Sequence, residues 1–573
     1  MHTFTVWASN ASSVDLVLRD GVLPMHEGSD GWWSREVAEA HHGTDYAFAV
    51  DGSNPLPDPR SPWQPDGVHG FSRVFDAGRF RWTDSEWTGR DVRGSVFYEL
   101  HLGTFTPEGT LAAAAEHLDY LVLLGVEIVS LMPVAAFPGR HGWGYDGVDL
   151  YAVHDPYGGP EALQAFVNRC HEVGLAVCLD VVYNHLGPSG NYLDSFGPYF
   201  TDRHTTPWGP AVNLDDTGST EVRRFICDNA LRWFRDFHID ALRLDAVHAL
   251  LDESPTHLLA QLSTETASLS EELGRPLGLV AESDLNDPRM VEPVSEGGLG
   301  MTAQWNDDFH HALHTLLTGE RAGYYEDFAE SGVFAKVLTK VFLHDGAYST
   351  FRGKDWGRPV DPAMHRGGQF LAYTSDHDQV GNRALGDRPA LTPGQYSIGA
   401  ALVLTSPYTP MLFMGEEWGA STPWRYFTDH DEPELAEAVR TGRRQEFASF
   451  GWDADEIPDP QDPATWRSSV LNWSEVDEAP HRELLAWYRD LLALRARTPE
   501  LTDDRLSSVS VSEGPDRLIV SRGNLRVVVN LGEAEAVIPV EGASYILLAF
   551  GEPELLADSV RMSGHTVAIV LVR

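Results

Sequence analysis

Eight short apolar segments, most of them followed by a loop and an amphipathic stretch, constrain the fold of this chain most strongly. They are VFYELHLGTF, EIVSLMPVA, LAVCLDVVY, IDALRLDAV, LGLVAES, MTAQWND, FLAYTSDHD and PMLFMGEE. One intervening stretch, STEVRRFICDNALRWFRDF, has Val222, Phe225, Ile226, Leu231 and Phe234 at helical spacing after a Ser/Thr cap. Near-continuous apolar strands that alternate with helices over roughly 400 residues are typical of a parallel barrel. We therefore predict an α/β fold, a (β/α)8 TIM barrel with its active site at the C-terminal ends of the strands.

The 573 residues are too many for one core, and two β-rich regions flank the barrel. Residues 1–92 read as short strands broken by Gly, Pro and Asp, which predicts a β-sandwich that either binds glycans or only packs. We assign 93–500 to the catalytic barrel and 501–573 to a C-terminal β-domain. The Gly-, Pro- and aromatic-rich segment 186–213 is long for a βα loop, so we expect an inserted lobe over the site.

Charge and composition limit the possible partners. The formal net charge is -43, from 85 acidic and 42 basic residues, and such a field repels nucleic acid and anionic membranes. No segment approaches the ~20 apolar residues of a membrane span, and the N-terminus lacks the basic region of a signal peptide. The apolar contexts of Cys170, Cys178 and Cys227 predict buried thiols in a reducing compartment. We expect a cytoplasmic protein with neither a nucleic-acid nor a membrane partner.

Four acidic segments lie at the ends of predicted strands. They are DVVYNH (180–185), ALRLDAV (241–247), LVAES (279–283) and SDHDQVGN (375–382). Carboxylates gathered at one end of a barrel repel one another and cost folding energy, so their presence indicates chemistry.

Two of these segments predict carboxyl groups in different environments. Strand alternation puts Arg243 and Asp245 on one face, so the arginine keeps Asp245 ionised, as a nucleophile requires. Glu282 ends an apolar run, which raises a carboxyl pKa and favours a general acid. Asp378 offers a third carboxylate that could stabilise positive charge.

An ionised and a protonated carboxyl group fit the template of a glycoside hydrolase. Their separation, which decides between retention and inversion, does not follow from the sequence. Aromatic rings that could stack on sugars occur nearby: Trp143, Tyr145, Tyr183, Tyr192, Tyr199, Trp208 and Trp305.

Taken together, the four segments resemble the α-amylase superfamily of retaining glycosidases. The resemblance implies that Asp245 is the nucleophile, Glu282 the acid/base and Asp378 the stabiliser of the transition state. It further implies sugar contacts in the cleavage subsite for His185, Arg243, His377 and the stacking aromatic Tyr145.

Further segments between about residues 95 and 490 resemble the maltooligosyltrehalose trehalohydrolase family. They include FYELHLGTFTPEGT, LMPVAAFPGRHGWGYDGVDLYA, FMGEEWGASTPWRYFTDH and PDPQDPATWRSSVLNW. This resemblance implies hydrolysis of the α-1,4 bond beside the terminal trehalose unit of maltooligosyltrehalose, with trehalose and a maltooligosaccharide as products. It implies saccharide contacts from His248, Asp308 and Asn382, maltooligosyltrehalose and related α-glucans as ligands, and neither a cofactor nor a metal.

Two alternatives remain from the sequence. A glycogen-branching or debranching enzyme would share the barrel and an N-terminal β-module, and a non-catalytic barrel would only bind glycans. One position departs from the superfamily, whose last segment usually reads Asn-His-Asp where this chain has Asp376-His377-Asp378. The extra carboxylate either raises the pKa of a neighbour or points outwards.

Overall fold

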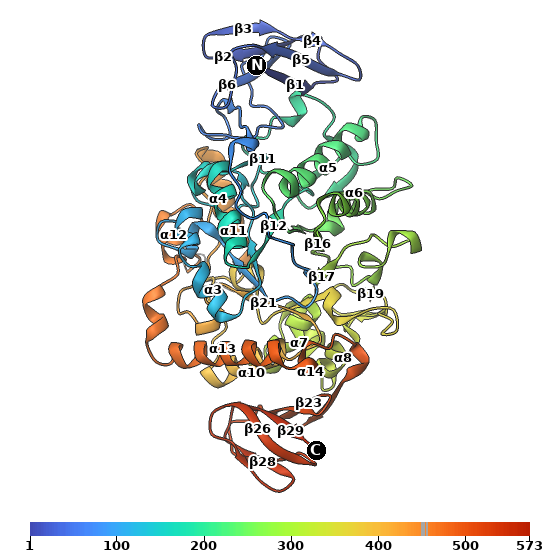
Figure 1. Cartoon of the computed structure of the whole chain (residues 1–573), viewed down its shortest axis with the longest axis vertical. Coiled ribbons are helices and arrows are strands. Elements are labelled where there is room, and N and C mark those ends of the chain that lie inside the picture. The colour runs from blue at the N-terminus through green and yellow to red at the C-terminus, as the bar shows by residue number, and fades with distance from the viewer. Residues whose placement is uncertain (449–452, 454–455) are drawn as a thin grey trace.

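The computed structural model describes residues 1–448, 453 and 456–573. Figure 1 shows three parts along the long axis of the molecule: a β-rich N-terminal part, a large α/β part, and a β-rich C-terminal part at the opposite end. The fold predicted from the sequence is therefore confirmed, with the barrel in the middle and one β-domain on either side.

The N-terminal part is a sandwich of two small sheets. One pairs β1 (His2–Trp7), β5 (Trp32–Val37) and β4 (His26–Glu27), and the other pairs β3 (Gly21–Pro24), β2 (Val14–Leu18), β6 (Asp45–Val50) and β7 (Ser72–Arg73). The ring of Trp7 packs edge-on against Tyr199, with centroids 5.2 Å apart, and the indole of Trp32 donates a hydrogen bond to Glu221. No aromatic side chain in residues 1–92, all of which the structure describes, is exposed. Of the two predicted roles for this domain, these contacts therefore favour packing against the barrel over glycan binding.

Eight parallel strands close the central barrel. In spatial order they are β8 (Phe97–Leu100), β9 (Ile128–Leu131), β12 (Ala176–Val181), β15 (Ala241–Leu244), β16 (Gly278–Ala281), β17 (Ala303–Trp305), β20 (Phe370–Ala372) and β21 (Thr409–Phe413). Each of the eight apolar segments supplies one strand, as predicted. Alternate side chains such as Phe97, Cys178, Ala241 and Met411 fill the interior below the site, which makes the barrel a packed core rather than a pore.

Helices surround the strands, and most of the longer ones bury an apolar face. The longer ones are α4 (Gly159–Glu172), α5 (Ser219–Asp236), α6 (Leu258–Leu273), α7 (Asp307–Thr318), α8 (Val333–Lys340), α10 (Pro393–Leu404), α11 (Pro433–Ala448) and α13 (His481–Arg497). In α5 the residues Val222, Phe225 and Phe234 are buried, as their spacing predicts. The expected Ser/Thr cap is wrong: the N-cap is Gly218, in the left-handed region at φ 84°, and no side chain caps the helix.

Shorter helical elements lie in the connections. They are α1 (Leu102–Phe105), α2 (Leu111–Ala115), α3 (Leu118–Leu124), α9 (His377–Gly381), α12 (Pro463–Ser468) and α14 (Pro499–Thr502). Three strand pairs also lie outside the barrel: β10 (Ala135–Ala136) with β11 (Asp149–Val153), β13 (Phe200–Thr206) with β14 (Gly209–Val212), and β18 (Ala347–Ser349) with β19 (Lys354–Trp356). The β13–β14 hairpin forms the second half of segment 186–213, which we expected to be an inserted lobe.

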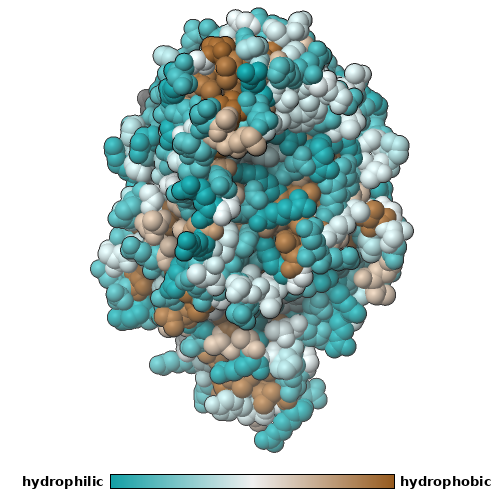
Figure 2. Space-filling model, turned by 45° about the horizontal axis from the view of Figure 1, so that its top comes forward, coloured by the Kyte–Doolittle hydropathy of each residue, from teal (hydrophilic) through white to brown (hydrophobic). Residues whose placement is uncertain are grey.

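The C-terminal part contains two antiparallel sheets. One has the order β22 (Val509–Gly514), β23 (Arg517–Arg522), β24 (Leu525–Asn530), β29 (Thr566–Val572) and β26 (Ala543–Phe550), and the other β25 (Ala536–Pro539), β28 (Ser559–Met562) and β27 (Glu554–Leu555). The three cysteines are buried and free, as predicted. Among the described residues, no helix has the length and apolar character needed to cross a membrane. The face in Figure 2 is mainly hydrophilic, in keeping with the acidic composition.

Candidate active site

The side chain of Arg243 organises the carboxylates at the C-terminal end of the barrel. Arg243 on β15 is paired in register with Asp180 on β12, and its Nη1 atom donates to both oxygens of Asp180 (3.1 and 2.9 Å) and to Asp245 (2.8 Å). Its Nη2 atom forms an ion pair with Glu282 at 2.8 Å. The guanidinium is 1% exposed and lies 4.4 Å from the centroid of Trp305. One buried cation thus contacts acidic groups from three neighbouring strands.

Asp245 is held in the ionised form. Burial acts to raise the pKa of Asp245, but the Arg243 guanidinium and a hydrogen bond from the Asn184 amide (2.7 Å) bring it below its ordinary value. Asn184 Nδ2 also donates to the main-chain carbonyl of Asp245 at 2.9 Å, so this amide orients the whole residue. An ionised, oriented carboxylate at this position can act as a nucleophile.

Glu282 has the opposite protonation preference. Burial raises its pKa well above the ordinary value, and the charges of Asp245 and Asp378 act in the same direction against the Arg243 cation. Its Oε2 accepts the backbone N–H of Ala246 at 2.7 Å, which places it next to Asp245. Two neighbouring carboxyl groups with pKa values shifted apart are the arrangement of a nucleophile and a general acid.

His377 and Tyr145 form a hydrogen-bonded chain beside these groups. The Tyr145 hydroxyl donates to Asp180 (2.8 Å) and lies 2.8 Å from Nε2 of His377, and the two rings are stacked. Burial raises the pKa of Asp180 to about 7, although the Arg243 cation acts against this shift. Because Arg243 and Tyr145 both donate to Asp180, we describe it as a carboxylate.

Asp376, the position that departs from the superfamily, is the N-cap of α9. Its side chain accepts the backbone N–H groups of Asp378 and Gln379, and the Gln379 side chain accepts the N–H of Asp376 in return. Asp376 is buried, so the alternative of an outward-pointing carboxylate is wrong. Burial raises its own pKa well above the ordinary value.

Two adjoining cavities meet at the acidic groups. The larger, of about 630 Å³, is lined by Trp143, Tyr145, Asp146, His185, Leu186, Pro188, Trp208, Asp245, Ala246, His248, Glu282, His377, Asp378, Asn382, Tyr426 and Thr428. The smaller, of about 230 Å³, shares Glu282, Asp378 and Asn382 with it and extends towards Trp305, Asp307, Tyr324 and Phe351. A ligand centred on Glu282 can therefore extend in both directions.

The structure brings together nine of the ten site residues predicted from the sequence. Asp245, Glu282, Asp378, Tyr145, His185, His248, His377 and Asn382 line the larger cavity, and Arg243 lies beneath it. Asp308 is the exception. Its buried Oδ2 accepts from Asn286 Nδ2 and the backbone N–H of Leu343, whereas its neighbour Asp307 lines the smaller cavity. The prediction that Asp308 contacts the saccharide is therefore wrong, because Asp307, the first residue of α7, faces the site and Asp308 faces the core.

Only some of the predicted aromatic platforms face the cavities. Trp143, Tyr145 and Trp208 line the larger one and Trp305 the smaller one. Tyr183 and Tyr199 are core residues: the hydroxyl of Tyr183 donates to Asn229, and Tyr199 packs against Trp7. Tyr192 pairs its hydroxyl with His69. Each of these three belongs to the structural support of the lobe or barrel.

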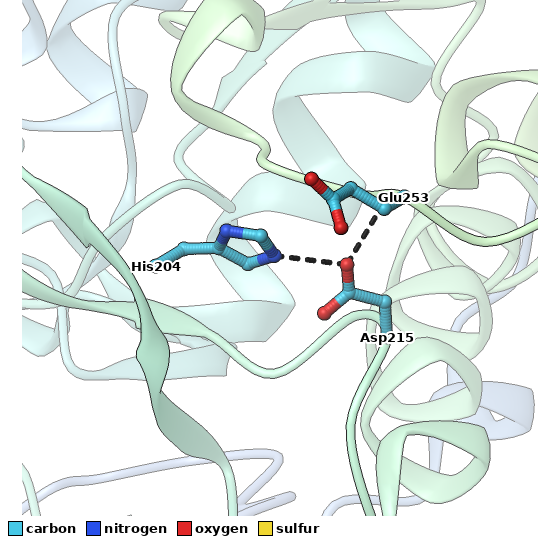
Figure 3. A group of neighbouring side chains, drawn as sticks. All are labelled: His204, Asp215 and Glu253. Carbon is cyan, nitrogen blue, oxygen red and sulfur yellow. Dashed lines mark hydrogen bonds and ion pairs between the residues drawn. The ribbon is translucent and has the colours of Figure 1, made fainter.

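The β13–β14 hairpin is tied down by a cluster of charged groups (Figure 3). His204 Nε2 lies 2.9 Å from Asp215 Oδ2, which also accepts the backbone N–H of Glu253 at 2.8 Å. These three side chains could hold a metal ion, and Arg203 already supplies a positive charge there, 2.5 Å from Glu253 and 3.8 Å from Asp215. We interpret the cluster as an ionic tie that fixes the lobe to the loop after β15.

Several residues of the site were not predicted from the sequence. Asp180 and Asn184 belong to the first acidic segment, and strand register with Arg243 would have indicated Asp180. Asp307 was one residue away from the prediction. Glu99, in the FYEL strand, contacts His377, and no local pattern signals a partner 278 residues away.

The fold and the site together define a glycoside hydrolase of the α-amylase type. Residues 74–202 match the family model of the alpha amylase catalytic domain, and residues 1–64 match carbohydrate-binding module 48, the isoamylase N-terminal domain. The chain is 52% identical to the malto-oligosyltrehalose trehalohydrolase of Arthrobacter ramosus, over 99% of both chains. It is 50% identical to that of Mycobacterium tuberculosis, over 100% of this chain and 99% of the relative. The chain belongs to the malto-oligosyltrehalose trehalohydrolase family.

A solved structure supports the same three-part architecture. A Salmonella typhimurium protein assigned to the alpha amylases superposes with a TM-score of 0.91 at 37% identity, over 100% of this chain and 97% of that one. The flanking domains are therefore common to both proteins, as well as the barrel.

Proposed function

We propose that this protein hydrolyses the α-1,4 bond next to the terminal trehalose unit of maltooligosyltrehalose and releases trehalose and a maltooligosaccharide. The observation that carries the proposal is the contact of one guanidinium, that of Arg243, with both Asp245 and Glu282, whose pKa values are shifted in opposite directions. The full-length similarity to trehalohydrolases supports this choice of substrate.

The reaction uses the two carboxyl groups in turn. Asp245 attacks the anomeric carbon while Glu282 transfers its proton to the glycosidic oxygen, and the trehalose unit leaves with that proton. The glucan is then bound to Asp245 as an ester. Glu282, now ionised, takes a proton from water, whose oxygen attacks the same carbon and frees Asp245.

The geometry favours retention of configuration. Retaining glycosidases place the two carboxyl groups ~5–5.5 Å apart and inverting ones ~6.5–9.5 Å. Here Asp245 contacts Nη1 and Glu282 contacts Nη2 of one planar guanidinium, whose donors form a compact fork. This arrangement supports the shorter separation.

The remaining residues position the sugar. We assign His185, His377 and Tyr145 to the hydroxyl groups and ring face of the sugar in the cleavage subsite, and Asp378 to the positive charge of the transition state. His248 and Asn382 line the same cavity and are proposed saccharide contacts. Trp208, half exposed at the turn of the lobe hairpin, stacks on His185 with ring centroids 4.6 Å apart and offers a face to a further sugar.

A comparison of two substrates tests this function. We would incubate the protein with maltooligosyltrehalose and with an unmodified maltooligosaccharide of equal length and quantify the products. Rapid release of free trehalose with slow cleavage of the unmodified chain is expected. Faster cleavage of the unmodified chain, or transfer of its segments to a second glucan, would favour the branching or debranching alternative.

Location and domain limits are also proposals. The buried free thiols of Cys170, Cys178 and Cys227 suit a reducing compartment, and we propose the cytoplasm. We retain 1–92, 93–500 and 501–573 as the three domains and propose a packing role for the first.

A further inference from the structure

Glu99 is a buried carboxylate that lies outside the four acidic segments. It is on β8, where Phe97 faces the barrel interior and Tyr98 and Leu100 pack outwards. By the same alternation Glu99 points into the barrel at the C-terminal end of the strand, and its side chain is 3% exposed. A charge at this depth is costly unless it is paired, so its partner indicates its role.

Both oxygens of Glu99 contact the same residue. Oε2 accepts the backbone N–H of His377 at 3.0 Å, and Oε1 lies 2.8 Å from Nδ1 of the His377 ring. A carboxylate can only accept, so Nδ1 must carry a proton. The pair of contacts fixes the ring orientation as well as the position of its backbone.

The other ring nitrogen must carry a proton too. Nε2 of His377 lies 2.8 Å from the Tyr145 hydroxyl, whose own hydrogen is donated to Asp180. The tyrosine oxygen therefore accepts from Nε2, and His377 is an imidazolium. Nε2 also lies 3.5 Å from Oδ2 of Asp378.

The charged groups around this ring favour that state. Glu99 faces it from β8, Asp376 and Asp378 from its own helix, and Asp180 from β12, whereas a protonated His101 nearby would oppose it. Burial acts to lower the pKa of His377, but the Glu99 carboxylate and then Asp378 raise it well above the ordinary value. Burial lowers the pKa of His101 to about 3, so His101 is neutral and adds no opposing charge near neutral pH.

We propose that Glu99 is a positioning residue for the hydrolysis: it holds His377 doubly protonated and oriented, so that Nε2–H remains a hydrogen-bond donor towards the sugar beside Asp378. This inference rests on the proposed contact between His377 and the sugar. A neutral His377 would keep one proton, and Glu99 would hold that proton on Nδ1. Nε2 would then lose its hydrogen and could no longer donate.

The Glu99→Gln variant tests the inference, because it keeps size and one acceptor but removes the charge. Without the charge of Glu99, His377 should lose its second proton at lower pH. We therefore expect the alkaline limb of the kcat/KM profile to move to lower pH by at least about one unit, with about tenfold lower kcat/KM at neutral pH and recovery at lower pH. The matched control is Glu127→Gln. Glu127 likewise accepts a backbone N–H, from Val96, and pairs with a cation, Arg90, but at the opposite end of the barrel. Its profile should match the wild type.

A second variant guards against a folding defect. Glu99→Asp keeps the charge on a shorter side chain, so it should lower the rate while retaining the wild-type shape of the pH profile. A Glu99→Gln profile that superimposes on the wild type, or falls equally at all pH values, would overturn the inference. If Glu99→Gln does not fold, a displaced limb in Glu99→Asp would overturn it. All profiles use whichever α-glucan the wild type cleaves, so a wrong substrate assignment would appear separately, in the wild type.

Discussion

Oδ1 of Asp376 accepts the backbone N–H of Asp378 at 2.8 Å, so one carboxylate caps the short helix that presents the other. The cap aligns the first turn of α9, from which Asp378 reaches the cavity. An asparagine has the same acceptor atom at the same reach and is an equally good N-cap. The departure from the superfamily at this position therefore preserves the geometry on which the site depends.

Two replacements of Asp376 distinguish the effect of its acceptor oxygen from the effect of its negative charge. We expect Asp376→Asn to retain activity within a few-fold. Asp376→Ala should lose ~1 kcal/mol of stability, as for other N-caps, and at least about tenfold in kcat because Asp378 is displaced. Activity and chemical unfolding of both variants check this, and similar losses in Asn and Ala would contradict it.

The same pair of variants predicts a change in the pH dependence of stability. Because burial raises the pKa of Asp376 in the folded state, its contribution is fully present at low pH and is lost as pH rises through that pKa. Asp376→Asn cannot ionise, so its free energy of unfolding should fall less than that of the wild type as the pH is raised above about 4. Parallel pH curves for the two proteins would show that Asp376 does not titrate in this way.

The two carboxyl groups that we propose as catalytic, Asp245 and Glu282, predict a bell-shaped profile of kcat/KM. Activity should fall at acid pH as Asp245 is protonated, below the ordinary carboxyl range, and at alkaline pH as Glu282 loses its proton, above it. The apparent pKa values of the two limbs belong to the interacting pair of carboxyl groups rather than to either residue alone. In Glu282→Gln, assayed with a substrate whose leaving group needs no proton, the alkaline limb should disappear. Its persistence there would assign that limb to another group.

Trp208 should act on binding rather than on chemistry. Its indole is half exposed, lines the larger cavity and stacks on His185, so Trp208→Ala removes a sugar platform without opening the core. We expect KM to rise by about tenfold, the equivalent of ~1.4 kcal/mol, with kcat within about threefold. Tyr545→Ala, which truncates an exposed ring in the C-terminal domain, is the matched control. Equal KM values in both variants would remove Trp208 from the binding site.

The ionic tie of the lobe predicts insensitivity to chelators. Arg203 and His204 already face Asp215 and Glu253, so EDTA should change neither activity nor melting temperature. Asp215→Ala should cost ~1–3 kcal/mol, since it leaves the His204 ring and the backbone N–H of Glu253 without their acceptor, and should raise KM by loosening the hairpin. Asp202→Ala is its control, because Asp202 is exposed on β13, the strand that carries Arg203 and His204. A melting temperature that falls with EDTA and recovers with a divalent cation would instead identify a metal site.

Strand order and the main carboxylates follow from local pattern, because alternation and apolar runs are properties of a few adjacent residues. The facing pair Arg243 and Asp245 is the best example. Asp308 was mistaken for Asp307 because helix rotation decides which of two adjacent residues faces the site. Glu99 depends on the closure of the barrel, which brings β8 next to the helix after β20, and no local pattern contains that contact.

Proton NMR of the first turnovers with maltooligosyltrehalose tests the central claim most directly. Trehalose has no reducing end, so the only new anomeric centre belongs to the released maltooligosaccharide. We predict that free trehalose appears together with the α-anomer of that chain, before mutarotation produces the β-anomer, and that Asp245→Asn gives neither signal. Initial appearance of the β-anomer, or cleavage that yields glucose or maltose without trehalose, would contradict the account.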